Sequence, residues 1–257
     1  ICVCIYIFML QLSARLNRLA PSATLAMSQK SAELKAQGVD IINLSVGEPD
    51  FNTPEHIKVA AKQAIDDNWS RYSPVPGYLD LREAICGKLL RENHLEYTPA
   101  QIVVGNGAKQ AVCNVLLSVV GEGDEVIIPA PYWVSYPDMV RLADGTPVFV
   151  EAKIEQNFKI TPAQLEAAIT PRTRVVMACT PNNPTGTILT ARELADLVTG
   201  VPRDVVVLID EAYLDFVTDP EAGDALTLLA DAPNLVVSRT FSKAHALAGM
   251  RVGYLVC

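Results

Sequence analysis

Apolar, β-branched runs alternate with amphipathic segments from residue 100 onward. The apolar runs lie at 102–104, 126–128, 148–150, 175–178, 205–209, 235–237 and 252–256. Helix-like stretches separate several of them, at 108–119, 133–143, 162–169, 191–198 and 225–230. Continuous apolar strands joined by helical crossovers are typical of a mostly parallel sheet that is covered on both faces. We therefore predict an α/β fold with a seven-stranded, mostly parallel sheet and helices on both faces.

The pattern before residue 100 is helical. Residues 9–37 are rich in helix formers, with a hinge at Pro21-Ser22. A helix is predicted from Glu55, and a second one over residues 78–93, after a break at 73–77. In the first of these two helices, apolar residues recur at a spacing of three and four and should form one buried stripe: Ile57, Ala60, Ala61, Ala64 and Ile65.

Residues 1–10 are almost wholly apolar. The stretch is too short to span a bilayer as a helix, and no basic residues precede it. The first methionine is Met9, so we interpret residues 1–8 as a non-native leader. We expect neither a signal peptide nor a membrane segment.

The composition of the chain indicates which partners it can bind and in which cellular compartment it is expected. The net charge of −8 disfavours binding to nucleic acid or to an anionic membrane. The six cysteines form no CxxC pair and no metal-ligand cluster, so no metal site is predicted. Most of them lie in apolar runs, which is typical of buried thiols in a reducing compartment. We expect a cytoplasmic protein.

The segment after run 235–237 combines hydroxyls, a lysine and an arginine. Thr240 and Ser242 precede Lys243, and Arg251 follows eight positions later. Lysine forms a Schiff base with a carbonyl, and guanidinium groups bind phosphate oxygens in a fixed fork. The segment could therefore hold both the aldehyde and the phosphate of pyridoxal 5′-phosphate (PLP). Taken alone, it also fits a solvated lysine and arginine after a strand.

Ligands of such sheets bind beyond the carboxyl ends of the strands, so the residues after the other runs matter. Gly107 and Ala108 open a helix after run 102–104, where backbone N–H groups can meet a phosphate. A tight structural turn is the alternative, while Gln110 argues against a dinucleotide-binding loop. Trp133 follows run 126–128 and could stack on a planar ring or pack in the core.

Two polar side chains follow the next runs. Asn183, after run 175–178, could donate its amide to a ligand oxygen or simply belong to a loop rich in Pro and Gly. Asp210 follows five apolar residues and should be buried, at a cost of several kcal/mol unless it meets a cation. A protonated pyridine nitrogen is such a partner, and an unrelated buried salt bridge is the alternative. Together, the residues that follow these runs favour PLP as the ligand.

With these residues the chain resembles the large domain of class I/II (fold-type I) PLP-dependent aminotransferases over residues 15–257. The resemblance implies that Lys243 is the Schiff-base lysine, that Asp210 partners the pyridine nitrogen, and that Trp133 stacks on the ring. It implies that Asn183 and Tyr213 contact the ring oxygen O3′. The implied phosphate site consists of Gly107, Ala108, Thr240, Ser242 and Arg251.

The resemblance also implies partners. Tyr72 is similar to a tyrosine that reaches the phosphate of the neighbouring subunit, which implies a homodimer with shared active sites. Gly47 resembles the loop glycine whose N–H meets the substrate α-carboxylate. The substrates would be an amino acid and a 2-oxo acid.

The two parts of the chain resemble different members of the family. Residues 19–176, with Pro21-Ser22-Ala23-Thr24 and the segment 131–137, resemble bacterial aspartate aminotransferases, in which Lys109 and Thr24 would recognise the distal carboxylate of aspartate or glutamate. Residues from 179, with the segments 210–217 and 239–243, resemble histidinol-phosphate aminotransferases. A recombined or misassembled coding sequence is our hypothesis for this difference.

The resemblance further predicts a domain plan. Residues 9–48 would belong to a small domain, and 49–257 would form an incomplete PLP-binding large domain, because the family's C-terminal part, with its carboxylate-binding arginine, has no counterpart here. The predicted activity is transamination, with aspartate or glutamate and 2-oxoglutarate or oxaloacetate. Histidinol-phosphate transamination, a PLP-dependent lyase and an inactive PLP-binding fragment remain alternatives.

Overall fold

The computed structural model describes residues 11–44, 47 and 49–257. The predicted leader at 1–8 lies outside the described residues, and the predicted domain boundary at residue 48 falls on a gap. Four helices precede the sheet: α1 (Ala14–Asn17), α2 (Ala23–Ala36), α3 (Glu55–Asp66) and α4 (Leu79–Asn93). Among the described residues, no helix is both long enough and apolar enough to cross a membrane.

One seven-stranded sheet follows, with the strand order β1-β7-β6-β5-β4-β2-β3. Its strands are β1 (Gly105–Asn106), β2 (Glu125–Ala130), β3 (Thr146–Glu151), β4 (Thr173–Cys179), β5 (Val206–Asp210), β6 (Leu235–Thr240) and β7 (Val252–Val256). Strands β2 to β6 are parallel to one another, while β7 pairs antiparallel with β6 and β1 antiparallel with β7. The predicted seven-stranded, mostly parallel sheet is confirmed.

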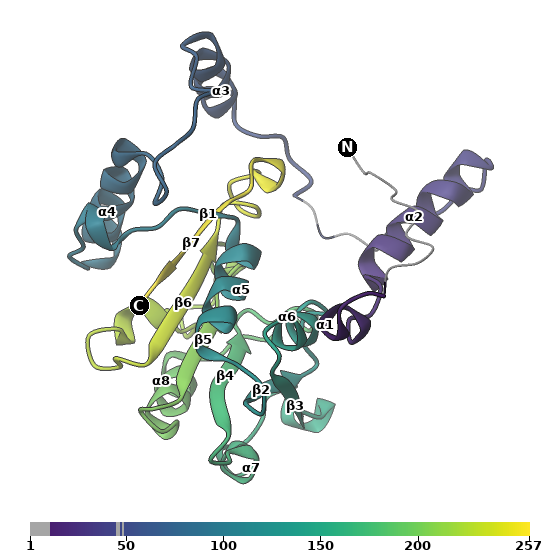
Figure 1. The fold of residues 1–257 in the computed structure, drawn as a ribbon, viewed down its shortest axis with the longest axis vertical. Coiled ribbons are helices and arrows are strands. Elements are labelled where there is room, and N and C mark those ends of the chain that lie inside the picture. The colour runs from purple at the N-terminus through teal and green to yellow at the C-terminus, as the bar shows by residue number, and fades with distance from the viewer. Residues whose placement is uncertain (1–10, 45–46, 48) are drawn as a thin grey trace.

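Helices cover both faces of this sheet (Figure 1). Helices α5 (Ala108–Val119) and α6 (Tyr136–Leu142) pack on one face, and α4, α7 (Pro162–Ala168) and α8 (Ala191–Gly200) on the other. Side chains alternate along each strand. In β2, Val126 and Ile128 therefore join the core under α5 and α6, whereas Ile127 joins the opposite core.

Short 3₁₀ turns complete the connections. They are η1 (Pro99–Gln101), η2 (Ile154–Gln156), η3 (Leu214–Phe216), η4 (Ala225–Leu228) and η5 (Ala248–Met250). The segment expected to be a helix at 225–230 is thus the single turn η4. There, Asp224 accepts a hydrogen bond from the backbone N–H of Leu226.

Two further expectations differ from the structure. The first strand forms at Gly105–Asn106 and not at 102–104, because the N–H of Val104 donates to the carbonyl of Pro76 (3.1 Å) and pairing with β7 begins at Gly105. The apolar stripe of α3 is not buried: the helix has no buried residue, Ile65 is 75% exposed, and Figure 1 shows α3 away from the sheet.

Strand β7 passes very close to the start of α5. A Cβ atom at Gly253 would collide with the backbone nitrogen of Ala108 and lie 2.8 Å from the carbonyl carbon of Gly107. Both obstacles are backbone atoms, which cannot move aside as a flexible side chain would. Glycine at 253 is therefore what allows β7 and the α5 N-terminus to meet.

We expect Gly253→Ala to lower the free energy of unfolding by about 1–3 kcal/mol, the usual cost of forcing extra atoms into a packed region. Chemical denaturation measures the change. Gly249→Ala is the matched control, because nothing lies within 4 Å of a Cβ at that position. Equal stability of the two variants would contradict the close approach.

Candidate active site

Asp210 ends β5 and is buried. Its Oδ2 accepts a hydrogen bond from the hydroxyl of Tyr136 (2.7 Å), and its Oδ1 accepts one from the backbone N–H of Ala212 (3.2 Å). Burial raises the pKa of the Asp210 carboxyl, and hydrogen bonding by Tyr136 and Ala212 opposes that rise. No cationic side chain among the described residues forms an ion pair with Asp210. The salt-bridge alternative therefore does not account for this carboxylate.

Lys243 lies in the loop after β6, with three of the predicted residues around it. Its Nζ donates to the carbonyl of Gly47 (2.6 Å) and lies 5.3 Å from the centre of the Tyr213 ring. The Asn183 amide donates to the Tyr213 hydroxyl (3.3 Å). Segments far apart in the sequence thus meet at the lysine.

The phosphate-site candidates meet beside the α5 N-terminus. Gly107 has a φ of +85°, and Nη2 of Arg251 would lie 2.5 Å from a Cβ added there. Nη1 of Arg251 donates to the hydroxyl of Ser242 (3.4 Å), and the Ser242 N–H donates to the hydroxyl of Thr240 (3.1 Å). A glycine at 107 therefore leaves room for the guanidinium.

The first turn of α5 provides further hydrogen-bond donors beside Arg251. Within the described part of the chain, the backbone N–H groups of Ala108 and Lys109 have no hydrogen-bond acceptor, as is usual at a helix start. Such groups and the positive end of the helix dipole favour an anion. A guanidinium, a hydroxyl and free N–H groups together make a donor set that fits a phosphate monoester.

Lys109 and Trp133 connect this anion site to Asp210. Nζ of Lys109 lies 4.7 Å from the centre of the Trp133 ring, which meets Tyr136 edge-on at 5.3 Å. Partial burial, and then the charge of Arg251, lowers the pKa of Lys109. The predicted stacking residue therefore lies between the anion site and the tyrosine that binds Asp210.

Two predicted residues lie apart from this cluster. Tyr72 is fully exposed in the connection between α3 and α4. Thr24 is in α2, which Figure 1 shows projecting away from the sheet. The structure does not bring either of them to Lys243, so their expected roles stay predictions.

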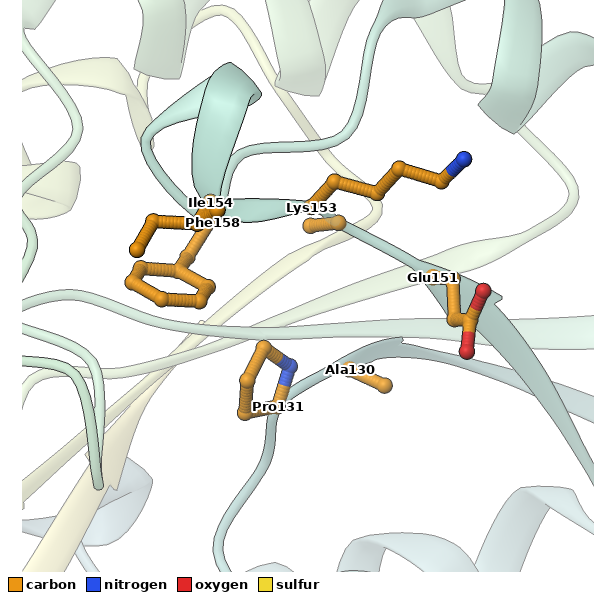
Figure 2. Close-up of a pocket in the computed structure, with 7 residues that line it drawn as sticks. Ala130, Pro131, Glu151, Lys153, Ile154 and Phe158 are labelled. Atoms are coloured by element: carbon orange, nitrogen blue, oxygen red, sulfur yellow. The ribbon is translucent and has the colours of Figure 1, made fainter.

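A shallow cavity of about 260 Å³ lies beyond the carboxyl ends of β2 and β3. Figure 2 shows its lining: Ala130, Pro131, Glu151, Ala152, Lys153, Ile154 and Phe158. None of the predicted site residues lines it. The cavity is separate from the cluster around Lys243.

Sequence reasoning missed Tyr136 and a second buried acid, Glu211. Tyr136 lies three residues after Trp133, where it was expected only to be helical. Glu211 pairs with Arg239, so the buried salt bridge considered for Asp210 forms one residue later. The available signal was the pair of adjacent acids after an apolar strand, because alternation sends them to opposite faces and each needs its own partner.

Comparison with known families agrees with this geometry. Residues 39–257 match the model of the family "Aminotransferase class I and II". The chain belongs to this family. Aminotransferases of this family use PLP, and the buried carboxylate, the lysine and the anion site described above fit that cofactor.

The most similar proteins include several aspartate aminotransferases. The aspartate/prephenate aminotransferase of Cereibacter sphaeroides is 49% identical over 249 residues, and the match covers 95% of this chain and 62% of that protein. The aspartate aminotransferase of Bacillus sp. (strain YM-2) is 42% identical over 246 residues, with 95% and 63% covered. The solved aspartate aminotransferase from Thermus thermophilus with maleate has a TM-score of 0.89 and 40% identity, with 96% and 64% covered.

These matches have two consequences. The chain spans less than two thirds of the length of these relatives, so the activity of the whole protein is taken up below as a proposal. Each match also extends over nearly all of the chain. The resemblance of the C-terminal part to histidinol-phosphate aminotransferases stays a prediction, as does the recombination hypothesis.

We expect Tyr136→Phe to make PLP binding fail at a higher pH than in the parent chain. The Tyr136 hydroxyl lowers the pKa of Asp210, so its loss raises that pKa. Binding of a ring cation needs the ionised carboxylate, and protonation as the pH falls removes it. PLP affinity measured against pH should therefore have its midpoint shifted upward.

Tyr132→Phe is the matched control. Tyr132 stacks on Phe149 (4.9 Å between ring centres), and no hydrogen bond from its hydroxyl to a described residue is found. An unchanged midpoint in Tyr136→Phe, or an equal shift in both variants, would contradict the role of the Tyr136 hydroxyl.

Proposed function

We propose that this chain carries the PLP site of a transaminase that moves an amino group between aspartate or glutamate and a 2-oxo acid such as 2-oxoglutarate or oxaloacetate. The observation that carries the proposal is the buried carboxylate of Asp210, which has no ion pair with a cation among the described residues. It lies at the same sheet edge as Lys243 and the anion site of Arg251 and Gly107. A pyridine ring with a phosphate and an aldehyde would meet all three.

The roles follow from the positions of the side chains. When bound, PLP supplies an aldehyde that condenses with amines and a ring that takes up the electron pair of a deprotonated Cα. Lys243 would hold the cofactor through Nζ and, once released, move the proton from the substrate Cα. Asp210 would keep the ring nitrogen protonated. Asn183 and Tyr213 would bind the ring oxygen, and Trp133 would stack on the ring.

The phosphate would be bound at the start of α5. Arg251, Ser242 and Thr240 would meet its oxygens from one side, and the N–H groups near Gly107 and Ala108 from the other. Because these groups are fixed by β6, β7 and α5, they would also set the position of the ring.

The substrate proposal rests on the names of the relatives. Aspartate stands in all three names given above, and prephenate in that of the Cereibacter protein. We propose that Lys109 and Thr24 bind the distal carboxylate and that the Gly47 N–H meets the α-carboxylate. A cytoplasmic homodimer, in which Tyr72 reaches the phosphate of the second subunit, completes the proposal.

We expect the chain to develop a visible absorption band with PLP. L-aspartate should remove this band, and 2-oxoglutarate should restore it. Restoration only when a 2-oxo acid is present separates a transaminase from a lyase, which needs no amino acceptor. Loss of the band without restoration by 2-oxoglutarate, oxaloacetate or prephenate would contradict transamination.

Lys243→Ala should abolish the visible band, because it removes the amine that would hold the aldehyde. Lys153→Ala is a suitable control, since Lys153 lines the separate cavity of Figure 2. Absorption spectra of both variants with PLP test this, and a band that persists in Lys243→Ala would remove this lysine from the proposed role.

A further inference from the structure

Arg239 forms a buried ion network with two acids beneath the proposed site. Its Nε donates to Oε2 of Glu211 (2.8 Å), and its Nη2 donates to Oδ1 of Asp224 (2.7 Å) and lies 2.7 Å from Oε2 of Glu211 as an ion pair. Oε1 of Glu211 accepts from the N–H of Ala225 (2.7 Å). The Glu211 side chain is fully buried, and that of Arg239 is only 9% exposed. We call Arg239, Glu211 and Asp224 the Arg239 network.

This network lies one residue away from the site on two neighbouring strands. Glu211 directly follows Asp210, and Arg239 directly precedes Thr240. Asp210 pairs with Ser238 in the sheet register, and the Glu211 N–H donates to the Ser238 carbonyl (3.0 Å). Beyond that point, the Arg239–Glu211 pair is the last hydrogen-bonded link between the ends of β5 and β6 in the described residues.

Stability does not explain such a network. Removing charges from water costs several kcal/mol per ion, and an apolar replacement of a buried ion pair is often neutral or stabilising. Burial raises the pKa of Glu211 to about 7 even though the charge of Arg239 acts in the opposite direction. What the ion pair supplies is a fixed distance and angle, since the guanidinium fork binds in one geometry.

We propose that Arg239, through Glu211 and Asp224, is a positioning residue that sets the distance between Asp210 and the Lys243 loop. This rests on the proposed function. Asp210 and Lys243 must engage opposite ends of one rigid ring. Asp210 ends β5, Lys243 lies in the loop after β6, and the register between these two strands ends at Asp210 and Ser238. The Arg239 network fixes that separation.

Two probes distinguish this role from general support of the fold. PLP would engage Asp210, the anion site and Lys243. Pyridoxamine 5′-phosphate has an amine in place of the aldehyde, so it would engage Asp210 and the anion site without bonding to Lys243. The ratio of the two affinities therefore reports how well Lys243 is placed relative to Asp210.

The variant to test is the double substitution Arg239→Met and Glu211→Leu. It removes the two buried charges together and so avoids leaving one buried charge unpaired, which costs about 3–5 kcal/mol. Asp224 loses its cation in this variant, but its side chain is 32% exposed and remains in contact with water. We expect a nearly unchanged unfolding midpoint and at least about a tenfold loss in the affinity ratio of PLP to pyridoxamine 5′-phosphate, as small misplacements of reacting groups cause. Arg239→Lys, which keeps the charge but loses the fork, should recover only part of the ratio.

The matched control is Arg172→Met with Glu125→Leu. Nε of Arg172 donates to Oε1 of Glu125 (2.9 Å) and thereby links β2 to the start of β4 at the opposite edge of the sheet. This control should leave the ratio unchanged.

Equal losses for both probes in the Arg239 variant, or no loss, would overturn the positioning role. A parent chain without a visible band on adding PLP would instead contradict the proposed function, and the positioning role would fall with it.

Discussion

A carboxylate buried at the end of β5 is the constraint on which the rest of the site depends. Leaving Asp210 charged away from water costs several kcal/mol unless donors or a cation surround it. The chain supplies neutral donors, the Tyr136 hydroxyl and the Ala212 N–H. It supplies no cation among the described residues, and in the proposed function the bound ring would provide the remaining compensation. The position of α6, which carries Tyr136, is therefore part of the chemistry.

The next residue shows the opposite solution. Glu211 points to the other face of the sheet and has its own cation in Arg239. The two adjacent acids thus differ: Glu211 has a cation within the fold, and Asp210 has none among the described residues, as the proposed function requires. Strand alternation makes this separation, because neighbouring side chains face opposite sides. The end of β5 can then carry the Glu211–Arg239 ion pair on one face of the sheet and the Asp210 carboxylate on the other.

Much of this architecture could be predicted from the sequence. Long apolar runs identified six of the strands within a few residues. The polar residues after those runs predicted Asp210, Asn183 and Lys243 as site residues, and their roles stay predictions. The strand at 102–104 was misplaced because Val104 binds the turn at Pro76, a contact that no local pattern reveals. The stripe of α3 has the right spacing for burial but meets no buried core in the described structure.

The missed residues share one cause. Tyr136 contacts Asp210, 74 positions away in the chain, and Glu211 contacts Arg239, 28 positions away, so both contacts are tertiary. A tyrosine in a helix and an arginine in a strand have many ordinary explanations. Only the adjacent acids, Asp210 and Glu211, gave a local indication that buried partners had to exist.

The antiparallel pairing of β6 and β7 has a consequence for how the site can change. Thr240 pairs with Gly253, and the connection between them carries Ser242, Lys243 and Arg251. One hairpin therefore carries the Lys243 amine and the Arg251 and Ser242 groups of the proposed anion site. The number of residues in its connection sets the distance between them. Substitutions within the connection can alter the strength of individual contacts. An insertion or deletion between Lys243 and Arg251 would instead change the spacing of the amine and the guanidinium, while the spacing of the two groups they would meet on PLP is fixed by the ring.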